Sequence, residues 1–242
     1  MKKKLLNNSI SESLIIDRYL SKLHFKKKGT FEFKNDAAYI KLSKNKKLIV
    51  TSDSISEDLD FFRYDNPKSI ASKITTINLS DLSAMGARPH SYILNLFLPS
   101  YINVNWIKIF TNELVKIQRK YKFYLLGGDL SKSDKLSISS TFFGLSKNNH
   151  VVTQNKISLH DDIWITGTLG DSYIGLQILK NNIKIDKTSQ KYFLKKYYYP
   201  QACNLGVKFA QLSKSMKDIS DGFVGDLKKM LDNKYGAKIF LD

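Results

Sequence analysis

The apolar residues of this chain fall into short segments whose spacing alternates between the pattern of a strand and that of a helix. Apolar residues at helical spacing predict helices at 10–23, 66–82 and 103–120. Compact apolar runs predict strands at 37–42, 47–52, 91–99, 122–126 and 135–144. No run approaches the roughly 20 apolar residues that a membrane-spanning helix needs. The first half is therefore predicted to be a mixture of strands and helices.

A polar stretch after Gly144 marks the predicted boundary between two domains, 1–145 and 146–242. The second domain is predicted to contain a strand at 162–167, helices at 173–179, 201–212 and 223–231, and a strand at 236–242. The run YYYP at 197–200 has two interpretations. It is either an aromatic surface on which bases stack or, as is commoner for such runs, packing at a domain interface.

The composition is strongly basic, with 39 Lys and Arg against 22 Asp and Glu, a net charge of +17. Such a charge suits nucleic acid, an acidic membrane surface or a phosphorylated ligand, although the coding bias of an AT-rich genome is a simpler explanation. The single Cys203 and four scattered His residues exclude a disulfide scaffold and structural zinc. Polar residues interrupt the N-terminal MKKKLL segment, so we expect no signal peptide and a cytoplasmic protein.

Several acidic residues follow apolar strands and lie next to Gly, Ser or Asn, namely Asp36, Asp53, Asp81, Asp129, Asp218 and Asp221. Each alone is more simply a turn former or helix cap. If the strand ends converge, the clustered carboxylates repel one another and need cations. Oxygen ligands without Cys or His select Mg²⁺, which commonly bridges substrate phosphates. The glycines of GGD and SDG would allow the backbone to approach a phosphate, whereas the P-loop, dinucleotide and protein-kinase motifs are missing.

The motifs NDAAYI, VTSDS, NLSDLSAMGARP, GGDLSKS, WITGTLGDSYIGL and DISDGFVGDL occur in the order found in the thiamine-monophosphate kinase family, which this chain resembles over nearly its whole length. That family is grouped with aminoimidazole ribonucleotide synthetase, selenophosphate synthetase and HypE. The resemblance implies an α+β fold: an N-terminal mixed sheet with helices that dimerises into a barrel-like interface, then a C-terminal α/β domain. It also implies an ATP site between the domains and the transfer of phosphate from ATP to thiamine phosphate, which gives thiamine diphosphate.

The resemblance also assigns roles by motif position. The implied Mg²⁺ ligands are Asp36, Thr51, Ser52, Asp53, Asp81, Asp129, Asp218 and Asp221, and the implied ATP contacts are Gly128, Asp129 and Ser220. No acid or base is expected, because the acceptor phosphate oxygen is already anionic and phosphoryl transfer needs mainly positioning and charge neutralisation. ATP, thiamine phosphate and a second copy of the chain are the expected partners, and neither nucleic acid nor a membrane is expected.

The chain departs from the family pattern at several positions. Lys34 and Asn35 replace a Gly-Asp pair before Asp36, Asp60 stands where a substrate-contacting His is usual, and Gln154 replaces an Arg that contacts the nucleotide. The family continues beyond the position of Asp242, so the C-terminal domain is expected to be incomplete. The alternatives are a truncated, inactive nucleotide-binding relic, a superfamily member with a different acceptor, and a basic nucleic-acid-binding module. Selenophosphate synthetase and HypE would each require a cysteine where this chain has none.

Overall fold

The computed structural model describes residues 12–27, 30, 40, 42–147, 150–154, 156–232 and 234–239. The predicted site residue Asp36 and most of the predicted strand at 37–42 lie outside these ranges. Among the described residues, no helix is long and apolar enough to cross a membrane.

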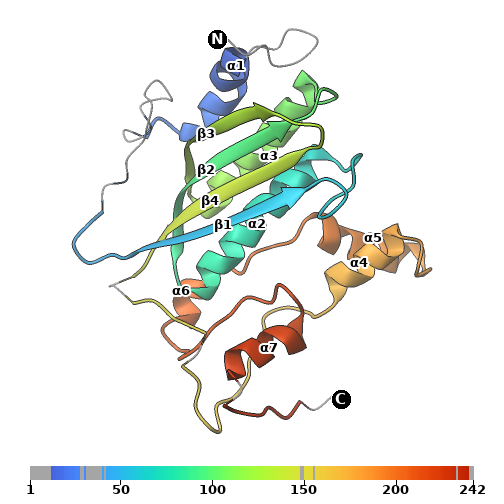
Figure 1. The fold of residues 1–242 in the computed structure, drawn as a ribbon. Coiled ribbons are helices and arrows are strands. Elements are labelled where there is room, and N and C mark those ends of the chain that lie inside the picture. The colour runs from blue at the N-terminus through green and yellow to red at the C-terminus, as the bar shows by residue number, and fades with distance from the viewer. Residues whose placement is uncertain are drawn as a thin grey trace.

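A mixed four-stranded sheet forms the centre of the molecule, with the strand order β1-β4-β2-β3 (Figure 1). Its strands are β1 (Leu48–Ser56), β2 (Arg88–Leu98), β3 (Tyr124–Lys132) and β4 (Ser137–Leu145). β4 runs antiparallel to both of its neighbours, and β2 and β3 are parallel and connected through a helix. The predicted mixture of strands and helices is confirmed as an α+β fold.

Two long helices, α2 (Pro67–Ala84) and α3 (Val104–Tyr121), cover one face of the sheet (Figure 1). The side chains of Asn66 and Asn103 cap them by accepting hydrogen bonds from backbone N–H groups of the first turn. Apolar residues of both helices are buried against the sheet: Ile70, Ile74, Leu82, Ile107, Phe110 and Leu114. The caps and apolar spacing identified in the sequence therefore predict both helices to within about two residues of their observed ends.

The opposite face of the sheet has no described helix over it and faces the viewer in Figure 1. Leu48, Val50 and Phe97 belong to this face, and their side chains are 37%, 54% and 37% exposed. Because side chains alternate between the two faces along each strand, every site residue on the sheet belongs either to the face beneath the helices or to this open face.

Residues 12–24 are helical, as α1 (Glu12–Ile15), the π-helical turn η1 (Ile16–Leu20) and the 3₁₀ turn η2 (Ser21–His24). Its apolar residues Ile15, Tyr19 and Leu23 are buried in the core. The buried amide of Gln118 on α3 donates a hydrogen bond of 2.9 Å to the carbonyl of Leu23. The helix predicted at 10–23 is confirmed over its described part.

The second part of the chain contains only helices among its described residues: α4 (Asp171–Leu179), α5 (Lys187–Tyr198), α6 (Gly206–Phe209) and α7 (Phe223–Leu231). The helices predicted at 173–179 and 223–231 are confirmed. The helix predicted at 201–212 is reduced to the single turn of α6. The sequence did not predict α5.

The strands predicted at 162–167 and 236–242 are wrong for the residues that the structure describes. Trp164 is 90% exposed, and Ile163 and Ile165 are 46% and 39% exposed. A strand needs a neighbouring strand to pair its backbone N–H and C=O groups. No described segment of the second part lies beside residues 162–167 in that way.

The YYYP segment packs against α2. The ring of Tyr197 is buried, and the ammonium of Lys73 lies 3.9 Å from its centroid. The hydroxyl of Thr76 donates a hydrogen bond of 3.2 Å to the carbonyl of Pro200. The segment thus joins the second part of the chain to the first, which favours the interface interpretation over base stacking.

Candidate active site

β1 and α2 bring the first two acidic residues together. Thr51 and Asp53 alternate with exposed residues along β1 and share the helix-covered face with buried Ile49 and Ile55. The hydroxyl of Thr51 donates a hydrogen bond of 2.5 Å to Oδ2 of Asp81, in the last turns of α2. Asp53 therefore lies inside β1 rather than after the end of a strand, and Asp81 lies inside the helix that the sequence predicted at 66–82.

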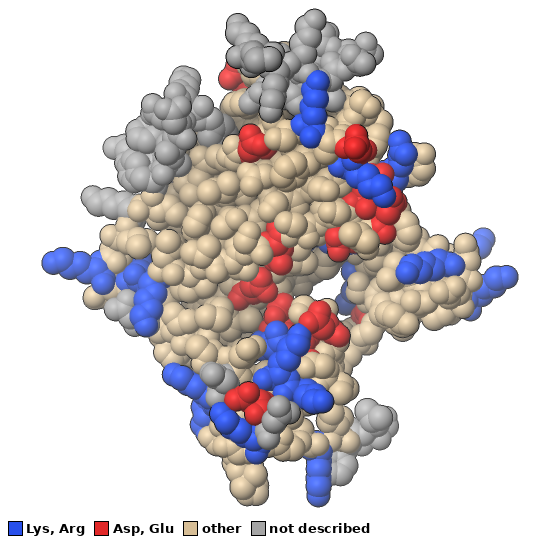
Figure 2. Space-filling view, in the orientation of Figure 1, with Lys and Arg blue, Asp and Glu red and all other residues tan. Residues whose placement is uncertain are grey.

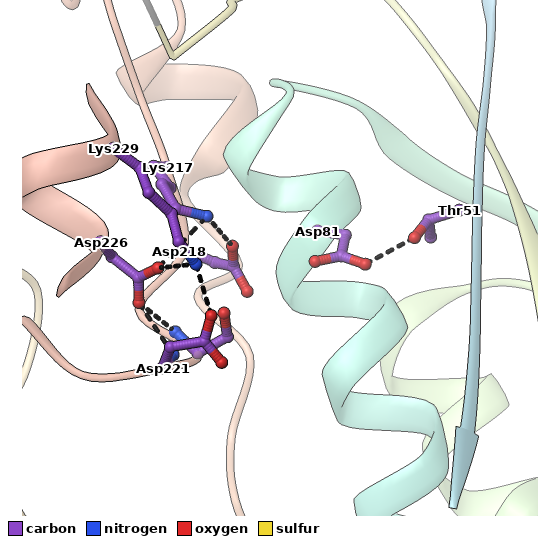
Figure 3. A network of polar contacts seen from close by, with 8 residues as sticks. Thr51, Asp81, Lys217, Asp218, Asp221, Asp226 and Lys229 are labelled. Carbon is purple, nitrogen blue, oxygen red and sulfur yellow. Dashed lines mark hydrogen bonds and ion pairs between the residues drawn. The ribbon is translucent and has the colours of Figure 1, made fainter. Parts of the chain in front are cut away.

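Asp218 joins them from the second part of the chain, where it precedes α7. Figure 3 shows its carboxylate and that of Asp81 facing one another from separate segments. Burial raises the pKa of Asp81, and the charge of Asp53 raises it further against the opposing effect of the Thr51 hydrogen bond. Burial and then the charge of Asp81 raise the pKa of Asp218. We call Asp53, Asp81 and Asp218 the carboxylate cluster.

The carboxylate cluster is short of positive charge although the chain as a whole is basic. Burial raises the pKa of Asp53, and the charge of Asp218 adds to this effect, while a hydrogen bond with Asp81 opposes it. Lys217 supplies an ammonium beside the cluster, with its Nζ 3.7 Å from Oδ1 of Asp218. Figure 2 shows acidic side chains across the middle of this view, with Lys and Arg gathered below them.

The chemistry of the carboxylate cluster fits Mg²⁺, since carboxylate and hydroxyl oxygens are hard ligands and no Cys or His belongs to the cluster. Among the described residues, no three His, Cys, Asp or Glu side chains are close enough to coordinate one ion together. Mg²⁺ commonly uses one or two carboxylates and completes its shell with water and substrate phosphates. The arrangement therefore suits an ion that arrives with a phosphate ligand.

The side chain of Asp226, in the first turn of α7, holds the backbone of the loop Asp218–Gly222. Oδ2 of Asp226 accepts hydrogen bonds from the backbone N–H groups of Ser220 and Asp221, at 2.8 and 2.9 Å (Figure 3). Burial alone would raise the pKa of Asp226, but these two hydrogen bonds and the charge of Lys217 lower it overall. The loop thus presents Ser220 and Asp221 on a defined backbone, with both residues exposed.

The GGD segment of β3 lies apart from the carboxylate cluster. In the register of the sheet, Asp129 is aligned with Asn95 on β2, Ser139 on β4 and Ser54 on β1. Its neighbour Gly128 is instead aligned with Leu94, Ser140 and Asp53. Since aligned residues share a face, Asp129 lies on the open face and its side chain accepts a hydrogen bond from Ser131.

Ser52 also belongs to the open face, where its hydroxyl lies 2.8 Å from that of Thr141. The side chains of Ser52 and Asp129 are therefore not brought to the carboxylate cluster within one chain. Two strands, β4 and β2, separate β3 from β1.

The remaining predicted residues lie around the edges of the site. The carboxylate of Asp60 accepts a hydrogen bond of 2.8 Å from the N–H of Ser56, and its carbonyl accepts one from Lys73. Gln154 is exposed and follows Thr153, which pairs with Ser215 in an isolated bridge close to Asp218. Asp221 forms an ion pair with Lys229.

Sequence reasoning missed Asp226 and Lys217, although both lie within the segment KDISDGFVGD. The signal that was available is the spacing of Asp226, which follows Gly222 by four residues and so lies in the first turn of the predicted helix. A carboxylate there can accept hydrogen bonds from the preceding loop.

Comparison with known proteins finds relatives that cover most of the chain. Residues 34–146 match the family described as AIR synthase related protein, N-terminal domain. The chain is 34% identical over 238 residues to the thiamine-monophosphate kinase of Buchnera aphidicola subsp. Acyrthosiphon pisum, covering 96% of this chain and 72% of that protein.

Two solved structures are similar in fold. The thiamine-monophosphate kinase of Stenotrophomonas maltophilia K279a gives a TM-score of 0.76 at 28% identity, covering 82% of this chain and 64% of the other. A structure described as AaThiL complexed with AMPPCP and TMP gives a TM-score of 0.71 at 27% identity, covering 81% of this chain and 63% of that one. The chain thus spans between about three fifths and three quarters of the length of these relatives. It belongs to the thiamine-monophosphate kinase family.

Proposed function

We propose that the chain carries out the ATP-dependent phosphorylation of thiamine phosphate to thiamine diphosphate. The observation that carries the proposal is the carboxylate cluster, because it joins residues of β1, α2 and the segment before α7 on one side of the sheet. Family membership supports it, as does the relative described with AMPPCP and TMP.

In this proposal several Mg²⁺ ions would each be held by one or two carboxylates of the carboxylate cluster, with Thr51 beside Asp81, and would complete their shells with water and substrate phosphates. Asp221 offers a further carboxylate at the exposed edge of the loop. When bound, Mg²⁺ would neutralise the negative charge of the triphosphate. The protein itself positions the ligands: the hydroxyl of Thr51 fixes the orientation of the Asp81 carboxylate. The neighbouring negative charges disfavour the binding of any anionic ligand that is not accompanied by a cation.

The nucleotide is proposed to lie against the loop Asp218–Gly222. Ser220 supplies a hydroxyl there. Gly222 has a φ of 104°, and a Cβ there would meet nothing within 4 Å, so the backbone at Gly222 is accessible to a phosphate. Gln154 follows Thr153, which pairs with Ser215 three residues before this loop, and it can offer a neutral amide, a weaker phosphate partner than a guanidinium. Oδ2 of Asp60 accepts a hydrogen bond from the N–H of Ser56, so Oδ1 is the oxygen proposed to contact the acceptor.

No general base is needed in this proposal. The acceptor is a phosphate oxygen that is already anionic at neutral pH, so positioning and charge neutralisation carry most of the catalysis. The net charge of +17 also attracts two anionic substrates to the protein, an effect that falls with ionic strength.

We further propose that the chain forms a homodimer through the open face of the sheet, in the cytoplasm. Leu48, Val50 and Phe97 expose apolar surface there, and Asp129 lies on the same face. A V50K variant should then elute from a sizing column as a monomer at a concentration at which the parent chain is a dimer. Equal elution of both proteins would contradict this interface.

The kinase proposal is tested by following ADP release with ATP, Mg²⁺ and thiamine phosphate. D81N should lose at least about 100-fold in rate, because a metal ligand is replaced by a neutral amide. D232N is the matched control: Asp232 ends α7, is exposed and pairs with Lys234. Nucleotide binding without thiamine-phosphate-dependent ADP release would overturn the proposal, and full activity of D81N would overturn the assignment of the carboxylate cluster.

A further inference from the structure

Asp226 is nearly fully buried, at 2% exposure, yet it is an ionisable side chain. Its Oδ2 accepts both backbone hydrogen bonds from the loop, from Ser220 and from Asp221. A buried carboxylate that accepts hydrogen bonds from two backbone N–H groups stabilises one backbone conformation, because leaving the carboxylate or either N–H group unpaired costs free energy.

Two lysines complete the surroundings of Asp226. Its Oδ1 lies 3.5 Å from Nζ of Lys217 and 3.4 Å from Nζ of Lys229 (Figure 3). Lys217 also reaches Asp218, and Lys229 also reaches Asp221. Each lysine therefore connects Asp226 to one of the two acidic residues that border the loop.

We propose that Asp226 is a positioning residue for the nucleotide: it sets the backbone of the loop and, through Lys217 and Lys229, the directions of Asp218 and Asp221. This inference rests on the proposed function. Asp226 itself is not expected to touch the nucleotide or a metal ion, because both of its oxygens are engaged within the protein.

A simpler role for Asp226 is to stabilise α7, since an acidic residue in the first turn favours a helix. The two roles make different predictions. A helix-stabilising role changes the melting temperature and leaves nucleotide affinity in the folded protein unchanged. A positioning role changes the affinity at temperatures at which the variant is fully folded.

The first experiment is a calorimetric titration of the full chain with AMPPCP in the presence of Mg²⁺. D226N keeps the size of the side chain but removes its charge and one of its acceptors. The dissociation constant should rise by about 10- to 100-fold, which is typical when a residue that orients binding groups is changed. D232N, which alters an exposed acidic residue at the other end of the same helix, should bind as the parent chain does.

The second variant, D226E, retains the charge near both lysines but moves the carboxylate away from the two N–H groups. If Asp226 positions the loop, D226E should also bind AMPPCP more weakly than the parent chain does. Recovery of the parent affinity by D226E would show that charge alone matters and would overturn the proposal. Should D226N not fold, D226E carries the same test.

The third measurement is amide hydrogen exchange of the nucleotide-free protein. The N–H groups of Ser220 and Asp221 should exchange faster in D226N and D226E than in the parent chain, while residues of α2 stay protected. Unchanged exchange at Ser220 and Asp221 would overturn the positioning role. If the parent chain binds no AMPPCP, the proposed function fails; if the parent and D226N bind it equally, only the role of Asp226 fails.

Discussion

The hydroxyl of Thr51 on β1 donates a hydrogen bond of 2.5 Å to Oδ2 of Asp81 on α2. The bond joins strand and helix through a carboxylate whose pKa is raised by burial and by the charge of Asp53. Since the ionised form of Asp81 is disfavoured in the folded protein, the pair connects the core of the fold to the electrostatics of the site.

Replacing Asp81 by Asn should stabilise the protein in the absence of Mg²⁺. The folded protein holds the Asp81 proton more tightly than the unfolded chain does, so the ionised carboxylate costs stability above its raised pKa. This cost disappears as the pH falls to the unfolded value near 4. The melting temperature of D81N should therefore be roughly 1 to 3 °C higher than that of the parent chain at pH 7.5. The increase is small because Asp81 is half-buried and solvent screens its charge.

The measurement is the melting temperature of D81N and of the parent chain between pH 4 and pH 8. The difference between them should shrink toward the acidic end. D232N, at an exposed carboxylate, is the control. A difference that stays constant with pH would show that Asp81 acts through packing rather than through charge.

Mg²⁺ should stabilise the parent chain at pH 7.5, because an ion that binds only the folded state raises the free energy of unfolding by about 2.7 kcal/mol at 100 times its dissociation constant. D53N should lose most of this gain, since Asp53 is one of the three residues of the carboxylate cluster. The comparison is thermal unfolding with and without Mg²⁺, with Na⁺ used to hold ionic strength constant. An equal gain in D53N would exclude Asp53 as a ligand.

The sequence predicts α2 and α3 well because a capping Asn and a helical period agree at both helices, and Gly86 and Pro89 add breakers beyond the end of α2. It fails at 162–167 because alternation specifies a strand only if a neighbouring strand exists, and that depends on distant residues. It misses α5 because only Tyr197 of that helix is buried, so the apolar period is weak. The N-cap at Asp186 was the readable signal.

The candidate site likewise has features that the sequence predicts and features that it does not. Thr51 and Asp53 share a face because strand side chains alternate, and this could be predicted from the sequence. That Asp129 lies on the other face depends on the register of β3 against β2, which contains a bulge between Tyr92 and Ile93. Nothing local in the sequence reveals that register. Likewise, residue type alone does not reveal that Asp226 is buried whereas Asp221 is exposed.

The N-cap of α5 is a measurable contribution to the second part of the chain. Oδ1 of Asp186 accepts hydrogen bonds from the N–H groups of Thr188 and Ser189, at 2.9 and 3.1 Å. D186A should lower the free energy of unfolding by about 1 kcal/mol, as removal of an N-cap acceptor commonly does. Urea unfolding is the measurement, and K187A, one residue further on, is the control. An unchanged midpoint would mean that α5 unfolds separately from the rest of the protein.

The close approach of β2 and β3 depends on the absence of a side chain at Gly128. A Cβ at Gly128 would lie 1.7 Å from the carbonyl oxygen of Leu94, whereas one at Gly127 would meet nothing within 4 Å. A backbone oxygen in a sheet cannot move aside as a flexible side chain can. G128A should therefore lower the free energy of unfolding by about 1 to 3 kcal/mol or more. G127A should change it by less than about 1 kcal/mol, since an added methyl group mainly restricts the unfolded chain.

Urea unfolding of both variants distinguishes the two positions. An equal free energy of unfolding in G128A and G127A would show that the strands can separate without cost.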